Sequence, residues 1–210
     1  MIVPALLSET REELAAMLVT CEPFAPCVQI DVMDGEFVPS RSIGPADLYG
    51  LSYKGKSEAH VMAKDPLFWI ERFAEFGVFR FIFHFEADVE HSRVIPIIKR
   101  YGMEAGLAVN PATGIDEFES LLEQIDSVLF MSVNPGFYGA TFLPEVLSKV
   151  SEFKRRYPAK IAGIDGGIKS DNLAGVVAAG VDYICVGSAI LKAGSPAKAY
   201  AEMVNSIKTR

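Results

Sequence analysis

The polar residues with the clearest chemical potential lie within or at the ends of short apolar segments. Gln29 and Asp31 are two positions apart in the segment Val28–Val32, so in a strand their side chains point to the same face. That face is the protein interior if Ile30 and Val32 pack outward. A buried carboxylate without a partner is strongly destabilising, so Asp31 requires a metal ion, a hydrogen-bond network or a raised pKa.

Asp165 follows a later apolar segment, Lys160–Ile164, in the position that corresponds to Asp31. Two carboxylates in one cavity suit the removal of a proton from one face of a carbon and its delivery to the other. His60 ends a third apolar segment and would complete a nitrogen and oxygen ligand set for one divalent ion such as Zn, Fe, Mn or Co. The alternative interpretation is a buried polar network that only fixes the strands.

Glycine-rich segments follow the last two apolar segments. Gly166 and Gly167 come directly after Asp165, and Gly187 and Ser188 follow Val186. Glycines allow backbone N–H groups to approach phosphate oxygens, and a short helix beginning near Ser188 would add its positive end, so we expect a phosphate site.

Two further groups of residues could contribute to the same cavity. The segment 132–139 contains Gly136 and Gly139 and is expected to fold over a ligand, either as a moving loop or as a static turn. Met33, Met62 and Met131 stand at strand ends, where their polarizable sulfurs could line the site, although packing alone explains most methionines.

These residues are positioned by a regular alternation of short β-branched segments and amphipathic segments, which predicts repeated βα units. The predicted strands are Ile2–Leu6, Val28–Val32, Glu58–Met62, Phe79–Phe83, Ala105–Val109, Ser127–Met131, Lys160–Ile164 and Tyr183–Val186. The predicted helices are Arg11–Val19, Pro66–Phe76, Ser92–Tyr101, Ile115–Ile125, Pro144–Tyr157, Lys169–Ala179 and Pro196–Lys208, with a short one after Gly44.

Eight such units favour an α/β fold of the closed (β/α)₈ TIM-barrel type over an open doubly wound sheet. No Pro-, Gly- or Ser-rich linker interrupts the series, so we predict a single domain over residues 1–210. In such barrels the active site lies where the strands end, which is where the candidate residues are found.

Composition excludes several classes of partner. The formal net charge is −7, which argues against nucleic acid and anionic membranes, because clustered Lys and Arg bind both. No apolar run approaches the roughly 20 residues needed to span a bilayer, and no targeting segment is evident, so we expect a cytoplasmic protein. Cys21, Cys27 and Cys185 lack a paired spacing and are expected to be reduced.

Several segments, taken together, resemble the ribulose-phosphate 3-epimerase family, in order from Pro4 to Leu191. The most specific is the run Asp-Val-Met-Asp-Gly-x-Phe-Val-Pro. The matching segments are Gln29-Ile-Asp-Val-Met-Asp-Gly-Glu-Phe-Val-Pro, Ala59-His-Val-Met, Phe83-His-Phe-Glu-Ala, Gly106-Leu-Ala-Val-Asn-Pro-Ala-Thr, Met131-Ser-Val-Asn-Pro-Gly-Phe, Ile164-Asp-Gly-Gly-Ile and Gly187-Ser-Ala-Ile.

The resemblance implies a metal-assisted proton transfer at C3 of a ketopentose phosphate, which interconverts ribulose 5-phosphate and xylulose 5-phosphate in the pentose phosphate pathway. It implies that Asp31 and Asp165 are the acid and base and also metal ligands, with His60 as a third ligand. The methionines would shield the reacting carbon. The residues implied to contact the sugar phosphate are His60, Met33, Met62, Met131, Gly136, Gly139, Gly166, Gly167, Gly187 and Ser188.

The chain departs from the family pattern at positions around the ligand. Gln29 stands where the family has a fourth metal-binding histidine, and an amide oxygen is a poorer ligand for borderline metals. Ala5 replaces a serine. Tyr138 and Ala140 replace a small residue and an amide in the loop after the sixth strand.

These departures leave an alternative open, a sugar-phosphate-binding paralogue with weak or lost epimerase activity. A barrel decarboxylase or aldolase-type lyase is a third candidate, but no lysine stands at the carboxyl end of a predicted strand. We also expect a homo-oligomer, without an identified interface.

Overall fold

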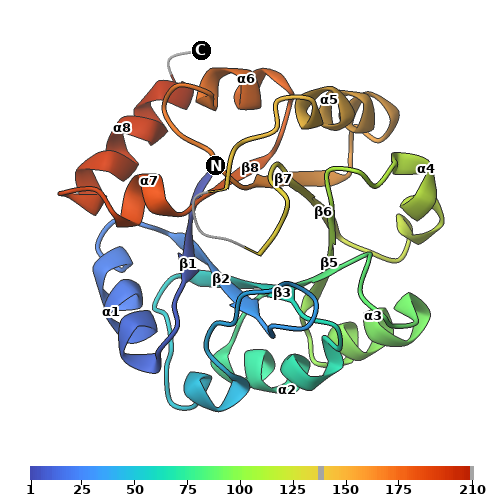
Figure 1. Ribbon diagram of the computed structural model, residues 1–210, viewed down its shortest axis with the longest axis horizontal. Coiled ribbons are helices and arrows are strands. Elements are labelled where there is room, and N and C mark those ends of the chain that lie inside the picture. Colours follow the sequence, from blue (N-terminus) through green and yellow to red (C-terminus); the bar gives the residue numbers. More distant parts are fainter. Residues whose placement is uncertain (137–139, 209–210) are drawn as a thin grey trace.

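The computed structural model describes residues 1–136 and 140–208 and shows eight parallel strands that close into a barrel in chain order (Figure 1). The predicted α/β barrel is therefore confirmed. No predicted strand end differs from the observed one by more than two residues. The strands are β1 (Ile2–Leu7), β2 (Cys27–Met33), β3 (Lys56–Met62), β4 (Arg80–His84), β5 (Glu104–Val109), β6 (Ser127–Met131), β7 (Ile161–Asp165) and β8 (Tyr183–Val186).

The helices surround the barrel as an outer layer (Figure 1). The helix α1 begins after Thr10, whose side chain accepts a hydrogen bond from the backbone N–H of Glu13 and so caps the first turn. The helical elements are α1 (Arg11–Cys21), η1 (Pro45–Leu48), α2 (Leu67–Phe76), α3 (His91–Arg100), α4 (Ile115–Phe118), η2 (Glu119–Leu121), α5 (Val146–Arg156), α6 (Leu173–Ala178), α7 (Ser188–Leu191) and α8 (Pro196–Lys208).

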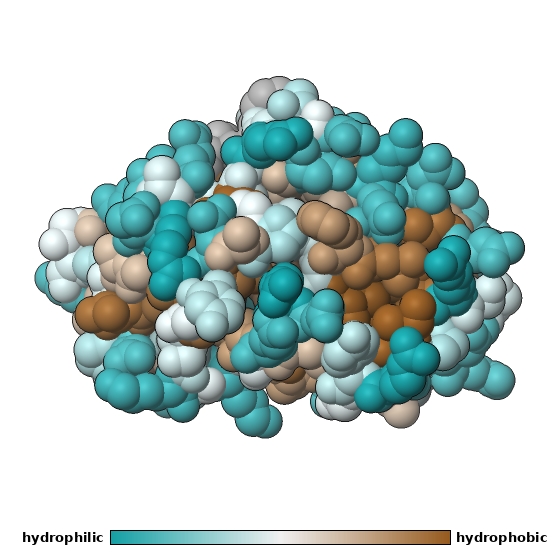
Figure 2. Space-filling view, turned by 90° about the horizontal axis from the view of Figure 1, so that it is seen from below, coloured by the Kyte–Doolittle hydropathy of each residue, from teal (hydrophilic) through white to brown (hydrophobic). Residues whose placement is uncertain are grey.

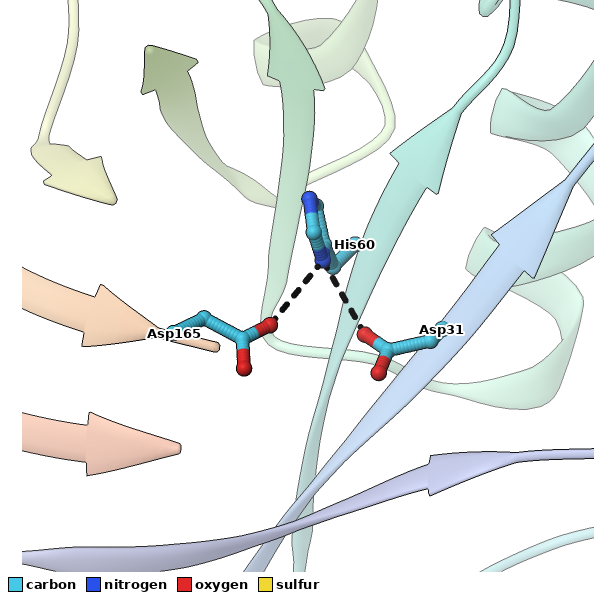
Figure 3. Close-up of side chains that lie close together, drawn as sticks. All are labelled: Asp31, His60 and Asp165. Atoms are coloured by element: carbon cyan, nitrogen blue, oxygen red, sulfur yellow. Dashed lines mark hydrogen bonds and ion pairs between the residues drawn. The ribbon is translucent and has the colours of Figure 1, made fainter. Parts of the chain in front are cut away.

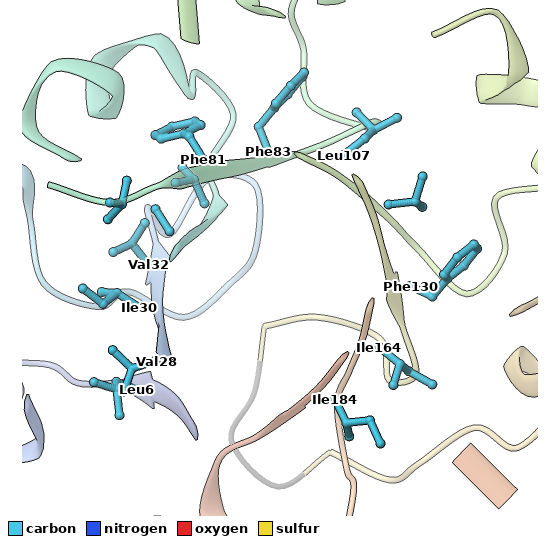
Figure 4. Close-up of a cluster of buried hydrophobic side chains, with 14 of the residues drawn as sticks. Leu6, Val28, Ile30, Val32, Phe81, Phe83, Leu107, Phe130, Ile164 and Ile184 are labelled. Carbon is cyan, nitrogen blue, oxygen red and sulfur yellow. The ribbon is translucent and has the colours of Figure 1, made fainter. Parts of the chain in front are cut away.

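Alternation along the strands decides which side chains face the helices. Ile30 and Val32 of β2 belong to the apolar layer between strands and helices, and Phe81 of β4 packs edge-on against Phe73 of α2 (Figure 4). Each such side chain contributes about 1.5–3 kcal/mol when it leaves water. Because Ile30 and Val32 point outward, their neighbours in sequence point into the barrel.

The barrel interior is filled by a second, smaller apolar cluster and by buried charges. Val3, Ile82 and Leu129 belong to the apolar cluster. Arg80 lies 3.1 Å from Glu58 and 2.7 Å from Glu104, which neutralises its charge inside the barrel. The interior is therefore a packed core, as in other barrels of this architecture.

The helix predicted over residues 115–125 forms only in part. The chain makes one α-helical turn in α4 and then tightens into the 3-10 turn η2. The buried face of this segment consists of Ile115, Phe118, Leu122 and Ile125.

The helix predicted over residues 169–179 begins later than expected, at Leu173. The Asn172 side chain accepts a hydrogen bond from the Lys169 N–H and donates one to the Gly167 carbonyl. Side chains of Asn compete with helical hydrogen bonds in this way, so the preceding residues form a turn.

The surface is mostly hydrophilic on the side that carries α2, with one concentrated apolar area (Figure 2). None of the helices in the described parts of the chain is both long and apolar enough to cross a membrane. All three cysteines are buried and unpaired, as expected.

Candidate active site at the carboxyl ends of the strands

A cavity at the carboxyl ends of the strands collects most of the residues singled out in the sequence. Its walls come from β1, β2, β3, β6, β7 and β8 and from the loops that follow them. The cavity is lined by Ala5, Asp31, Met33, His60, Met62, Met131, Gly136, Ala140, Asp165, Gly166, Gly167, Gly187 and Ser188, together with Leu7, Pro135, Ile168, Lys169 and Cys185. Tyr138 and Gly139 lie outside the described residues.

Three titratable side chains converge at the floor of this cavity. Nδ1 of His60 lies 3.0 Å from Oδ1 of Asp31 and 3.4 Å from Oδ2 of Asp165. Figure 3 shows the two carboxylates reaching the ring from different strands, β2 and β7. All three residues are at least nine-tenths buried, so their mutual interactions are only weakly screened by water.

The environment raises the pKa of two of these groups. Burial and the charge of Asp165 raise the pKa of Asp31 to about 6, although hydrogen bonds from His60 and Gln29 oppose the shift. Burial alone would lower the pKa of His60, but the contacts with Asp165 and Asp31 outweigh it and raise that pKa to about 9. A carboxyl group that titrates near neutrality is suited to proton transfer.

Gln29 lies directly beneath the two carboxylates. Its amide nitrogen donates to Oδ1 of Asp31 and to Oδ2 of Asp165, both at 2.8 Å. Its amide oxygen accepts the thiol hydrogen of Cys185 at 3.0 Å. Burial raises the pKa of the Cys185 thiol far above its ordinary value, so the sulfur keeps this hydrogen. The amide is therefore held with its nitrogen, and not its oxygen, toward the acidic pair.

A second histidine stands behind His60, on the side away from the carboxylates. Nε2 of His84 lies 3.0 Å from Nε2 of His60, and Nδ1 of His84 lies 3.3 Å from a carboxylate oxygen of Glu86. Burial lowers the pKa of His84 to about 4, so its ring is neutral near pH 7. The sequence showed His84 as a polar residue beside a strand end, but nothing in it indicated that the ring faces His60.

Glu86 is fixed by the loop that follows β5. Its Oε1 accepts hydrogen bonds from the Asn110 N–H at 2.8 Å and from the Thr113 hydroxyl at 2.5 Å. Burial would raise the pKa of Glu86, but the hydrogen bonds from His84, Thr113 and Asn110 lower it overall. Glu86 is therefore a carboxylate near neutral pH.

The glycine loops form a further part of the cavity wall. Gly166 and Gly167 have φ values of 120° and 63°, and a Cβ on Gly167 would lie 2.8 Å from the backbone nitrogen of Phe142. Only glycine combines this backbone conformation with so close an approach. Ser132 donates to the Gly166 carbonyl at 2.7 Å and so ties the loop after β6 to the loop after β7.

Lys169 is the one lysine or arginine among the residues that line the described part of the cavity. The glycine-rich segment predicts a phosphate site but by itself assigns no role to Lys169. Its position two residues after Gly167, in a loop expected to bind an anion, was a usable signal, because a protein of net negative charge needs a local positive charge to attract an anion.

The cluster of Asp31, His60 and Asp165 could hold one divalent ion. Each residue offers one ligand atom, and these atoms all lie within 4.8 Å of one another. Two carboxylate oxygens and one imidazole nitrogen suit a borderline divalent ion. Gln29 directs amide hydrogens toward the same carboxylates, so in this arrangement it offers no ligand atom.

Comparison with known proteins gives consistent matches. The model of the ribulose-phosphate 3 epimerase family matches residues 1–191. Ribulose-phosphate 3-epimerase from Escherichia coli (strain K12) is 38% identical over 173 residues, covering 79% of this chain and 77% of that protein. Ribulose-phosphate 3-epimerase 1 from Cupriavidus necator is 35% identical over 216 aligned residues, covering 98% of this chain and 90% of that protein.

A solved structure supports the fold independently. A crystal structure of KGPDC from Streptococcus mutans has a TM-score of 0.74 to this chain and covers 99% of it, with 97% of that chain aligned. The sequence identity is 14%, so this likeness carries the barrel architecture alone.

Proposed function

We propose that this chain, which belongs to the ribulose-phosphate 3-epimerase family and is an isomerase acting on carbohydrates, interconverts ribulose 5-phosphate and xylulose 5-phosphate. The two sugars differ in configuration at C3, which is adjacent to the C2 ketone. Their interconversion requires one proton to leave C3 from one face and another to arrive from the opposite face.

Asp31 and Asp165 are proposed to carry these two protons. Each uses one carboxylate oxygen for its contacts with Gln29 and His60, namely Oδ1 of Asp31 and Oδ2 of Asp165. The other oxygen of each takes no part in these contacts and can face the substrate. One residue then accepts the C3 proton as a carboxylate while the other, protonated, delivers its own to the opposite face.

His60, Asp31 and Asp165 are proposed to bind one divalent ion, Zn, Fe, Mn or Co. Such an ion supplies electrostatic stabilisation for the oxyanion that forms at the ketone oxygen as C3 loses its proton. Met33, Met62 and Met131 are all buried around the same cavity. They would limit the access of water to the reacting carbon, which strengthens the interactions of the charged groups.

The phosphate is proposed to lie against Gly166, Gly167, Gly187 and Ser188. Gly187 and Ser188 line the cavity at the start of the short helix α7, and the first N–H groups of a helix have no intrahelical partners. Lys169 would add the positive charge that the chain as a whole does not provide. Gly136 packs against Val38 across the mouth and would help cover the sugar.

The observation that carries this proposal is the convergence of Asp31 and Asp165 on one buried point within a cavity lined by the glycine loops. The test is the pair of variants Asp31→Asn and Asp165→Asn, which keep shape but remove a proton carrier. Each is expected to lower kcat by roughly 10²–10⁴-fold. The exposed Asp88 supplies the matched control Asp88→Asn.

Near-normal turnover by either site variant would contradict the two-carboxylate mechanism. A wild-type protein that binds ribulose 5-phosphate without turning it over would instead support the alternative of a sugar-phosphate-binding paralogue. Location in the cytoplasm and assembly into a homo-oligomer stay predictions.

A further inference from the structure

A line of side-chain contacts leads away from the cavity floor, from β3 to the end of β4 and the loop that follows it. It begins at Nε2 of His60, which faces Nε2 of His84 at 3.0 Å. It continues from Nδ1 of His84 to Oε2 of Glu86 at 3.3 Å. Both histidine rings are fully buried, so water cannot substitute for either contact.

The donor and acceptor properties of these side chains determine which of their atoms carry hydrogens. Two imidazole nitrogens that face each other can form a hydrogen bond only when one carries a hydrogen and the other a lone pair. Oε1 of Glu86 already accepts from Asn110 and Thr113, and a carboxylate has no hydrogen to donate. His84 must therefore donate to Glu86 from Nδ1, which leaves a lone pair on its Nε2.

The hydrogen-bond direction at His84 also determines the tautomer of His60 in the cavity. Since Nε2 of His84 accepts, Nε2 of His60 donates, and a neutral His60 keeps its lone pair on Nδ1. That lone pair points at the region where Asp31 Oδ1 and Asp165 Oδ2 also converge. Three electron-pair donors then face one point, which suits a cation.

We propose that His84 and Glu86 are positioning residues, which hold His60 in the Nε2–H tautomer so that its Nδ1 lone pair faces the two carboxylates. Partners of this kind orient ligating histidines and raise their basicity. The role of His60 as a ligand rests on the proposed function, whereas the direction of the hydrogen bonds rests on the contacts of His84 and Glu86 and on the donor and acceptor chemistry of imidazole and carboxylate.

The direct test reads the tautomers without measuring activity. The protein contains only three histidines, so long-range ¹H–¹⁵N spectra of ¹⁵N-histidine-labelled protein, with and without Zn²⁺, resolve each ring. His91→Gln assigns the third histidine, which bonds to the Phe85 carbonyl. We expect His84 to carry its hydrogen on Nδ1 in both samples and zinc-bound His60 to carry it on Nε2.

An Nε2–H tautomer at His84, or zinc-bound His60 with its hydrogen on Nδ1, would overturn the proposal. The measurement separates it from the proposed function. If zinc does not bind, the metal role of His60 fails, yet the tautomer of His84 still decides whether the line of hydrogen bonds runs as argued.

A single isosteric substitution should reverse the direction of the hydrogen bonds along this line. In Glu86→Gln, the amide oxygen accepts from Asn110 and Thr113, so the NH₂ group faces His84 and donates to its Nδ1. His84 then carries its hydrogen on Nε2, and His60 is forced to carry its own on Nδ1. We expect zinc affinity to fall about 10–100-fold, measured by chelator competition, although Glu86 is not a ligand.

The matched control is Thr113→Val, which removes one hydrogen bond to Glu86 but leaves its charge and therefore the direction of the line. Its zinc affinity should stay within about threefold of wild type. An equal loss in both variants would show that Glu86 acts only as a structural support. Unchanged affinity and unchanged tautomers in Glu86→Gln would also overturn the proposal.

Discussion

Two carboxylates that meet in a buried cavity repel each other unless hydrogens or cations lie between them. In this barrel, Gln29 supplies both of its amide hydrogens, one to Asp31 and one to Asp165. Cys185 holds the amide oxygen on the far side. Gln29 thus stabilises the acidic pair without adding a charge, and it does so at the position where the family resemblance implies a metal-binding histidine.

Replacing Gln29 should change metal preference more than fold. In Gln29→His, an imidazole lone pair takes the place of amide hydrogens, so zinc affinity should rise by roughly tenfold or more, which corresponds to about 1.4 kcal/mol. Epimerisation should become faster if the remaining site is competent. The wild type should favour harder ions such as Mn²⁺ or Mg²⁺.

Titration of both proteins with Zn²⁺ and Mn²⁺, while activity is followed, checks this prediction. Gln29→Leu is the control, because it removes the amide without adding a ligand and should not gain zinc affinity. Unchanged zinc affinity in Gln29→His would mean that position 29 does not reach the ion.

The raised pKa of His60 predicts a pH dependence with a definite sign. Asp31, Asp165 and His84 face this ring from three strands, and in the metal-free protein the first two hold a proton on it. Because the folded-state pKa of about 9 exceeds the ordinary 6.5, this proton stabilises the fold below about pH 6.5, and the contribution is lost as pH rises through 9.

A metal ion must displace that proton. Apparent Mn²⁺ affinity should therefore rise about tenfold per pH unit between pH 6.5 and 9. Chelator competition at a series of pH values measures it, with His60→Ala as the variant in which the slope should flatten. An affinity that stays constant across this range would contradict the assignment of His60 as a ligand.

At the scale of elements, the loops after β7 and β8 matter most, because the strands deliver them to the same side of the cavity. Lys169 lies two residues after Gly167 in the first of these loops and is exposed. An exposed charge contributes roughly 1 kcal/mol at most. Lys169→Gln should therefore raise KM for ribulose 5-phosphate about threefold to fivefold, with kcat little changed.

Steady-state kinetics with ribulose 5-phosphate and with ribulose separate the contribution of the phosphate group from that of the sugar. Lys198→Gln on α8 is the matched control and should leave both parameters as they are. We expect ribulose to be a far poorer substrate than ribulose 5-phosphate. Equal kcat/KM for the two sugars would refute the phosphate site altogether.

The strands and helices also differ in how well their positions could be predicted from the sequence. Strand positions followed from β-branched segments, and the inward direction of Asp31 followed from alternation with Ile30 and Val32, since both depend on local spacing. The late start of α6 did not follow, because the side chain of Asn172 competes with helical hydrogen bonds. The 3-10 turn η2 did not follow either, since apolar spacing does not separate it from α-helix.

At the scale of the whole molecule, closure of the barrel brings together residues that no local pattern connects. The amide orientation of Gln29 depends on Cys185, which is 156 positions away in sequence. The line through His84 depends on Glu86 and on a loop that follows β5. Residue types predicted the acidic pair and the glycine loops, but the direction of each hydrogen bond required the folded chain.

In the proposed reaction, two carboxylates on different walls of one barrel serve opposite faces of C3, and conversion of ribulose 5-phosphate in D₂O tests this arrangement most directly. At low conversion, NMR should show one deuterium at C3 of each xylulose 5-phosphate formed, while unreacted ribulose 5-phosphate keeps its protium, because the two protons travel on separate residues. A product that retains the substrate's own C3 protium, or a substrate that exchanges as fast as product forms, would contradict the account.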